Sequence, residues 1–225
     1  MRKKSTANLA RATEIFDGIA FEDVEPMLCR LNAAKKVYSK GDAVELAGFE
    51  AKKLHVIVSG RLHVYEKTFG GHQVLVREIC RGEVLGMWLL FVTEITCWPG
   101  TVVAAEQTTV IALDMAATRR MLWEAATPQV ARFAVNVSKS LVRAFYTTWR
   151  KLAVMSTPTI ETKVQIYLST LRNEAGRAGV VKVPFNRKLM AEYFGVTRPA
   201  LSKALGRMRD RGLLSWRRKE FTINF

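Results

Sequence analysis

The sequence predicts an α+β protein made of an N-terminal antiparallel β-roll of jelly-roll type, a long helix and a C-terminal winged helix-turn-helix. Three observations carry this prediction. Short β-branched and apolar runs fill residues 35–114, a stretch without helix breakers follows Pro128, and two cappable helices follow residue 185. The expected domains are a roll at 1–127, the long helix at 128–156 and the winged helix-turn-helix at 157–225.

Short helices are expected before the roll, because residues 9–31 carry apolar side chains at mixed helical spacings, with Pro26 in a first helical turn. The strands of the roll are expected at Val37-Tyr38, Leu54–Val58, Leu62–Tyr65, Val74–Ile79, Thr101–Ala105 and Thr109–Leu113. Glycine-containing turns separate them, as at Gly41, Gly60, Gly70-Gly71, Gly82 and Gly100. Many short strands at near-regular spacing are typical of a sandwich or barrel.

The long helix is expected to run from Pro128 to about Met155. Its apolar or small residues recur every three or four positions as a heptad-like seam of Val130, Ala134, Val137, Leu141, Ala144 and Thr148. Phe133, Phe145, Trp149 and Leu152 widen the apolar surface. Two apolar faces need two partners, which we expect to be the roll and the same helix of a second copy in a homodimer. The alternative is a helix that packs only within its own chain.

The C-terminal part is predicted to begin with a hinge at Ser156–Thr159, a second amphipathic helix at Ile160–Arg172 and a short strand at Val181–Pro184. Asn186 and Thr197 can each cap a helix, with Gly195 in the turn between them. Leu201, Leu205 and Met208 form the inward stripe of the second helix. A hairpin follows with its turn at Arg217–Glu220, which makes a wing with a cationic tip.

A helix-turn-helix presents the N-terminal end of its second helix to the major groove of DNA. Arg198 is the expected base-reading residue, because a guanidinium can pair with guanine through two hydrogen bonds. Ser202 and Lys203 are expected to reach a base edge or a phosphate, and Asn186 and Arg187 the sugar-phosphate backbone. The residues expected at the interface or on its exposed side also include Thr197, Ala200, Arg207 and Arg218. For Arg218 alone, an ordinary solvated surface position is the alternative.

The positive net charge of the chain favours binding to a polyanion. The chain has a formal net charge of +15, and residues 160–225 hold 14 Lys and Arg against 5 Asp and Glu. Such a field favours nucleic acid because phosphate neutralisation releases counterions, although an anionic membrane surface would also attract it. No apolar run approaches the ~18–20 residues needed to span a bilayer, and no secretory signal is recognised. We therefore expect no membrane association and a cytoplasmic location.

The three cysteines, Cys29, Cys80 and Cys97, are an odd number without a Cys-x-x-Cys pair. They are expected to be buried reduced thiols, with a thiol sensor or a haem ligand as the alternatives.

Several motifs together resemble the Crp/Fnr superfamily of bacterial transcription regulators. They are Lys40-Gly41-Asp42, Val56–Gly60 with Arg61–Val64, Gly71–Leu75, Arg81–Gly86 and the run Gly195–Leu205. The resemblance covers nearly the whole chain and implies a cyclic-nucleotide-binding-like roll, dimerisation through the long helix and a Crp-type helix-turn-helix. It further implies a sequence-specific regulator that binds double-stranded DNA at a two-fold symmetric site and has RNA polymerase as a further partner. Pro199 and Lys203 depart from the usual recognition helix, so a target sequence cannot be carried over.

The ligand site departs from the members that bind cyclic AMP. Those members have a Glu after the glycine equivalent to Gly86 and an Arg-Ser pair before the next strand, whereas this chain has Met87 and Trp98-Pro99. The residues expected at this pocket are Met87, Trp88, Cys97, Trp98, Phe145 and Tyr146. We expect an apolar, aromatic site for a small-molecule effector other than cyclic AMP. The alternative is that these side chains fill a core that takes no ligand.

An iron–sulfur cluster is not expected, because its four thiolate ligands cannot come from three cysteines of one chain. Haem stays open as a cofactor, since the C-terminal motif resembles a branch of the family, some of whose members respond to nitrosative stress through haem. The candidate ligands are His55, His63 and His72, with Cys80, Cys97 and Met87 as partners.

Enzyme activity is not expected. A cupin-like metal enzyme would need a His-x-His pair, which the sequence lacks, and no nucleophile elbow, P-loop or His-Glu-x-x-His occurs. A third class, a regulatory module that binds a ligand and a protein but no DNA, is disfavoured by the basic C-terminal segment.

Overall fold

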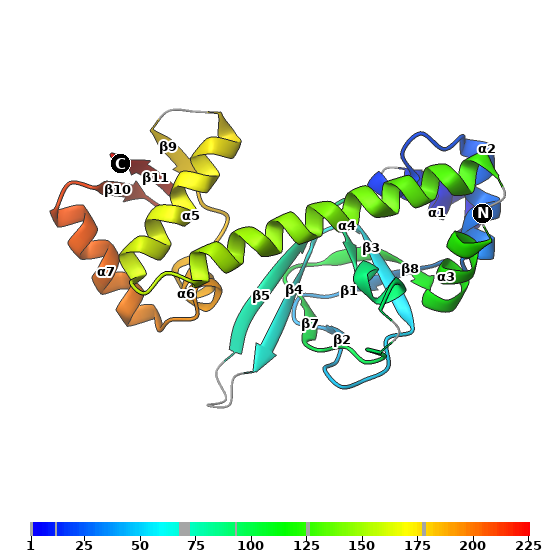
Figure 1. The fold of residues 1–225 in the computed structure, drawn as a ribbon, viewed down its shortest axis with the longest axis horizontal. Helices are drawn as coiled ribbons and strands as arrows, with labels where there is room; N and C mark the ends of the chain where they lie inside the picture. The colour runs from blue at the N-terminus through cyan, green and yellow to red at the C-terminus, as the bar shows by residue number, and fades with distance from the viewer. Residues whose placement is uncertain (1, 12, 68–72, 93, 125–126, 177–178) are drawn as a thin grey trace. The chain divides into compact units, whose positions relative to one another are not determined.

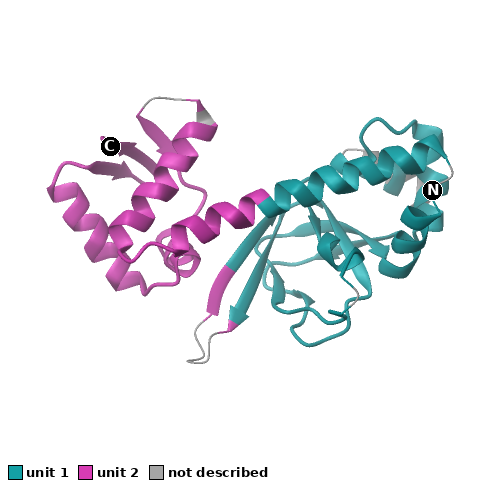
Figure 2. Cartoon of the chain, viewed as in Figure 1, with its two compact units in different colours: residues 1–66, 76–145 teal, residues 67–75, 146–225 magenta. Residues whose placement is uncertain are grey.

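The computed structural model describes the whole chain except residues 1, 12, 68–72, 93, 125–126 and 177–178. It contains two compact units, formed by residues 1–66 with 76–145 and by residues 67–75 with 146–225 (Figure 2). The long helix α4 (Pro128–Met155) contributes to both units. The domain limits proposed from the sequence therefore stay predictions.

Unit 1 begins with helices α1 (Arg2–Arg11), η1 (Glu14–Phe16) and α2 (Phe21–Arg30). The prediction that Pro26 lies in a first helical turn is wrong, because α2 starts at Phe21 and Pro26 lies in its interior. A proline there removes one backbone hydrogen bond. The helix nevertheless continues, since Val24, Met27 and Leu28 give it a buried apolar face on both sides of the proline.

Two four-stranded sheets form the roll (Figure 1). Their orders are β1-β8-β3-β6 and β2-β7-β4-β5. The elements are β1 (Ala34–Tyr38), β2 (Ala43–Glu45), β3 (Lys53–Ser59), β4 (Arg61–Lys67), β5 (Gln73–Cys80), β6 (Val84–Leu85), η2 (Met87–Leu90), β7 (Thr101–Ala104), β8 (Thr108–Asp114) and α3 (Met115–Trp123). All six predicted strands are confirmed. The short strands β2 and β6 were not predicted, because two or three residues carry no readable period. The helix α3 was not predicted either, although the Asp114 side chain caps it.

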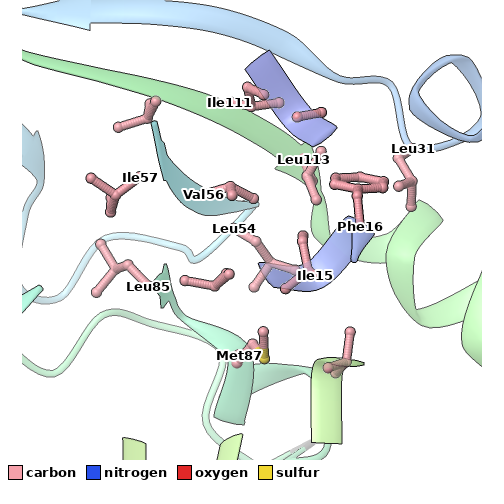
Figure 3. Close-up of a cluster of buried hydrophobic side chains, with 14 of the residues drawn as sticks. Ile15, Phe16, Leu31, Leu54, Val56, Ile57, Leu85, Met87, Ile111 and Leu113 are labelled. Carbon is pink, nitrogen blue, oxygen red and sulfur yellow. The ribbon is translucent and has the colours of Figure 1, made fainter. Parts of the chain in front are cut away.

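The main core lies where the N-terminal helices cover the β1-β8-β3-β6 sheet (Figure 3). Ile15 and Phe16 of η1 pack beside Leu54 and Val56 of β3, and the Phe16 and Phe133 rings lie 5.5 Å apart. The further core residues shown are Leu31, Ile57, Leu85, Met87, Ile111 and Leu113. Burying this apolar surface provides the main driving force for folding of the unit.

The helix α4 has the predicted bounds, but much of the predicted seam packs against the core of its own chain. Val130 and Val137 are buried in the core of unit 1 and Leu141 packs against it. The buried Asn136 amide donates hydrogen bonds to the carbonyls of Ile15 and Asp17, at 3.2 and 2.7 Å. This face of α4 is therefore fixed to η1.

A second apolar seam of α4 is exposed. It follows the same three- and four-residue spacing and consists of Val135, Val142, Phe145, Trp149 and Leu152, which are 48–66% exposed. The sequence indicated Phe145, Trp149 and Leu152 as extra apolar surface but did not separate the two seams. The difference is geometric: within unit 1 the core covers one side of α4, and Val135, Val142 and Phe145 lie on the other.

Unit 2 holds α5 (Ile160–Ala175), β9 (Val180–Lys182), α6 (Arg187–Phe194), α7 (Arg198–Asp210), β10 (Leu214–Arg217) and β11 (Glu220–Ile223). The three strands pair in the order β10-β11-β9. Tyr167 of α5 contacts the rings of Phe185, Tyr193 and Phe194, with centroid distances of 5.3–6.2 Å. This aromatic cluster joins α5 to α6. Within the described residues, no helix is long and apolar enough to cross a membrane.

Candidate nucleic-acid interface

The two helices of the helix-turn-helix are set by their caps, as the sequence predicts. The Asn186 carboxamide accepts a hydrogen bond from the Leu189 N–H at 2.9 Å, and the Thr197 hydroxyl accepts one from the Ala200 N–H at 3.3 Å. Gly195 ends α6 with φ = 64°, a left-handed conformation that favours glycine. The start of α7 is therefore fixed by local chemistry in the loop that precedes it.

The helix α7 has a buried and an exposed side. Leu201, Ala204, Leu205 and Met208 are buried. Arg198, Ser202 and Lys203 are exposed, as is Thr197, and Ala200 is half-buried. Two cations and two hydroxyls thus lie on the outward side of the first turns of α7. This arrangement can donate hydrogen bonds to base edges and phosphates.

Arg207 lies on the exposed side but is paired. Its guanidinium donates to the Glu161 carboxylate of α5, with Nε 2.9 Å from Oε1, and this contact holds the pKa of Glu161 below its usual value. The prediction that Arg207 is available to a partner is corrected, because the fold brings α5 beside the end of α7.

Arg187 turns inward instead of standing in solvent beside Asn186. Its guanidinium carbon lies 4.8 Å from the ring centroid of Trp216 in β10 and 4.9 Å from that of Phe221 in β11. Burial lowers the pKa of Arg187. Contact between Arg187 and the DNA backbone stays a prediction, and the sequence carries no signal for the stacking on Trp216.

The wing has an exposed cationic tip. Arg217 is opposite Glu220 in the backbone register of the hairpin, and Arg218 occupies the turn with φ = 57°. The Lys219 ammonium donates to the Pro184 carbonyl at 2.8 Å, which ties the tip to the segment after β9. Arg217, Arg218 and Lys219 are all exposed, so this tip can approach a phosphate backbone.

The predicted hinge after α4 is well supplied with hydrogen bonds. The hydroxyls of Ser156 and Thr157 donate to the carbonyls of Leu152 and Val154, each at 2.8 Å. The buried Lys163 ammonium donates to the Met155 carbonyl at 2.9 Å. The carbonyls of Leu152, Val154 and Met155, in the last turn of α4, are therefore satisfied from within unit 2, which stiffens this segment.

The six residues expected at an effector pocket do not share one environment. Met87 and Trp98 are each 3% exposed and belong to the core of unit 1, while Trp88 and Cys97 are half-buried. Phe145 and Tyr146 are exposed on α4. A cavity of about 290 Å³ lies next to this segment, lined by other residues that include Leu89, Ile95, Thr96, Asp114 and Arg119. Whether the six residues bind an effector stays a prediction.

The described histidines are held by carboxylates. His55 is buried with Nε2 2.5 Å from Oε1 of Glu45. His63 has Nε2 2.9 Å from Glu78 and Nδ1 3.2 Å from the Tyr65 hydroxyl. Neither presents an accessible ring nitrogen to a porphyrin, so these two residues do not fit haem ligation. The third candidate, His72, lies outside the described residues.

Cysteine chemistry differs among the three thiols. Burial, together with the nearby Glu78 and Glu83 carboxylates, raises the pKa of the Cys80 thiol to about 12. Because the thiolate is the reactive form, Cys80 is poorly suited to redox sensing at neutral pH. The expectation that all three are buried is wrong, because Cys29 is exposed on the outer side of α2 and Cys80 and Cys97 are half-buried. No group of three metal-ligating side chains occurs in the described part of the chain.

Two family models match the chain. The cyclic nucleotide-binding domain matches residues 35–124 and the Crp-like helix-turn-helix domain matches residues 162–224, so the two together cover well over half of the sequence. The chain belongs to the Crp/Fnr superfamily of transcription regulators. The matched C-terminal residues, which include α6 and α7, thus form a DNA-binding domain of the Crp type.

Solved structures share this fold at low sequence identity. FixK2 from Bradyrhizobium japonicum is 17% identical with a TM-score of 0.63, over 86% of this chain and 93% of that one. CLP from Xanthomonas campestris, described as a c-di-GMP responsive global regulator, is 17% identical with a TM-score of 0.70, over 89% and 99%. A CooA mutant from Carboxydothermus hydrogenoformans is 16% identical with a TM-score of 0.69, over 87% and 85%. A search of the curated proteins finds no match.

Proposed function

We propose that this Crp/Fnr regulator acts as a homodimer that binds a two-fold symmetric site in double-stranded DNA under the control of an effector other than cyclic AMP. The observation that carries the DNA-binding part is the exposed cationic side at the start of α7, with Arg198 and Lys203 on a helix whose opposite side is buried. RNA polymerase is the further partner that the family resemblance implies, and the cytoplasm is the location that such a role requires.

In this proposal Arg198 reads a base pair in the major groove, and Ser202 and Lys203 contact the next base edge or phosphate. Asn186, Thr197 and Ala200 lie at the two helix starts, where backbone N–H groups favour phosphate. Arg218 of the wing adds a backbone contact. Two such units in a dimer would occupy successive major grooves, spaced about 34 Å apart.

The test replaces Arg198 with alanine and measures affinity for the preferred duplex, which is first obtained by selection from random DNA. We expect a loss of about 1–3 kcal/mol and a relaxed preference at one base pair. Arg81→Ala is the matched control, because it removes the same charge from an exposed position in unit 1. Equal affinities for wild type and Arg198→Ala would show that α7 is not the reading helix.

Dimerisation through α4 is supported by its exposed seam. Val142, Phe145, Trp149 and Leu152 would place an apolar stripe in water in a monomer, and their heptad spacing suits a parallel pair of helices. We expect Val142→Glu to weaken the dimer at least tenfold, measured by analytical ultracentrifugation. Val37→Glu is the control, since Val37 is a comparably exposed valine in strand β1. If Val142→Glu changes the dimer dissociation constant no more than Val37→Glu does, the interface lies elsewhere.

Control by an effector rests on α4, which belongs to both units. An effector near Met87, Trp88, Cys97 and Trp98, with Phe145 and Tyr146 in the second half of α4, would change how α4 packs. Lys163, Ser156 and Thr157 donate hydrogen bonds to the last turn of α4 within unit 2. A change in the packing of α4 would therefore be transmitted to the helix-turn-helix.

Exclusion of cyclic AMP is supported by chemistry at two positions. A buried thioether at Met87 and a buried indole at Trp98 cannot replace a carboxylate for the ribose and a guanidinium for the phosphate. Native mass spectrometry of protein purified without oxygen, with and without added cyclic AMP, tests this. Bound cyclic AMP, or DNA affinity that depends on it, would contradict the proposal.

A further inference from the structure

Trp216 of the wing lies beneath two guanidinium groups from two different helices. The Arg187 guanidinium of α6 is 4.8 Å from its ring centroid, and that of Arg209 of α7 is 5.3 Å away. Phe221, directly opposite Trp216 in the hairpin register, stacks on it at 6.1 Å. The wing is thus joined to both helices of the helix-turn-helix through one indole.

The environment of Arg187 does not suit a direct phosphate contact. Its Nη1 contacts the Met190 sulfur at 3.8 Å, and its Nη2 and the Phe221 ring are buried. No hydrogen-bond partner for Nη2 is found within the described residues. A guanidinium over an aromatic face gains cation–π attraction that grows with desolvation. The guanidinium plane of Arg187 therefore packs on the aromatic rings of the wing.

Most charged side chains near this stack are cationic, and the carboxylates among them are Glu220, opposite Arg217, and Asp210, 3.6 Å from Arg209. Arg217, Arg218 and Lys219 follow Trp216 directly and are exposed. The cations outnumber these carboxylates and repel one another, so a contact that does not depend on ion pairs helps to hold the wing. The stacking of Arg187 and Arg209 on Trp216 provides it.

We propose that Arg187 is a positioning residue for DNA binding, which holds Trp216 against α6 and thereby sets where the cationic tip Arg217–Lys219 lies. The inference rests on the proposed DNA binding and deepens it, because it assigns Arg187 an indirect role and places the phosphate contact at the tip. A lysine keeps the charge but loses the planar stacking surface. Arg187→Lys therefore separates the two roles.

The experiment compares wild type, Arg187→Lys, Arg218→Ala and the double variant. Hydrogen exchange of the β10–β11 amides is measured without DNA, and affinity for the selected duplex is measured over a range of salt concentrations. We expect faster exchange in Arg187→Lys and an affinity loss on the order of tenfold, with a flatter salt dependence. Arg218→Ala alone should flatten the salt slope by about 1, and should cost little more when added to Arg187→Lys.

Lys188→Ala is the control for exchange, because it removes a neighbouring exposed charge of α6 without touching the indole. Lost affinity with unchanged exchange would overturn the inference, since Arg187 would then contact phosphate directly. Faster exchange with unchanged affinity would also overturn it, since the wing would then not contribute. If wild type binds no duplex at all, the proposed function fails, whereas the exchange comparison still reports whether Arg187 holds the wing.

Discussion

The sequence indicated a functional role both for the start of α7 and for the segment from Gly86 to Trp98. The two regions differ in exposure and in polarity. Arg198, Ser202 and Lys203 are exposed polar residues on a helix that is fixed by its buried side. Met87 and Trp98 are apolar residues inside the core of unit 1. Residues of the first kind can change binding without changing stability, whereas residues of the second kind change stability first.

The largest expected effect is at Trp98. Trp98→Ala removes a buried indole whose ring lies where a Cβ on Gly86 would come within 2.8 Å of it. We expect the free energy of unfolding to fall by about 3–5 kcal/mol, measured by urea denaturation at fixed protein concentration. Trp123→Ala is the control, because Trp123 is 64% exposed and should lose far less. A Trp98→Ala protein that keeps its stability but responds differently to the effector would show that Trp98 serves binding and not the core.

A smaller effect is expected at Lys203, and it should appear in binding alone. Lys203→Ala removes an exposed cation one turn into α7. If its partner is a phosphate, affinity falls similarly for all sequences and the salt slope decreases by about 1. Fluorescence anisotropy at several salt concentrations measures this, with Lys36→Ala of β1, an exposed lysine in unit 1, as the control. An unfolding midpoint that drops together with affinity would contradict the surface role.

The smallest effect is electrostatic and lies in unit 1. The Asp114 carboxylate accepts from the Ala117 N–H at 2.9 Å and pairs with Lys53, and these contacts lower the pKa of Asp114. Because the folded pKa is depressed, the stabilisation is present above the unfolded value of about 4 and is lost as pH falls below it. Asp114→Ala should cost about 1 kcal/mol at pH 7.

Thermal unfolding of wild type and Asp114→Ala from pH 7 down to pH 2.5 checks this prediction. The difference between the two proteins should shrink as the carboxylate becomes protonated. A difference that is independent of pH would mean that the Asp114 side chain contributes through packing and not through its charge.

Local chemistry explains what was predictable. The caps Asn186 and Thr197, the turn at Gly195, the bounds of α4 and the six longer strands depend on neighbours within a few residues, and all were predicted. The same holds for the buried stripe of α7, because helical periodicity alone places Leu201, Leu205 and Met208 on one side. The family resemblance followed from these short motifs.

Tertiary structure alone decided the rest. The sequence offered two apolar seams on α4, and only packing within unit 1 shows that Val130 and Val137 are inside while Val142 and Phe145 are outside. Arg187 and Arg207 look like surface cations by spacing, but α5 and the wing supply Glu161 and Trp216 as partners. Such contacts join residues far apart in the chain, and periodicity and composition carry no information about which distant side chain arrives.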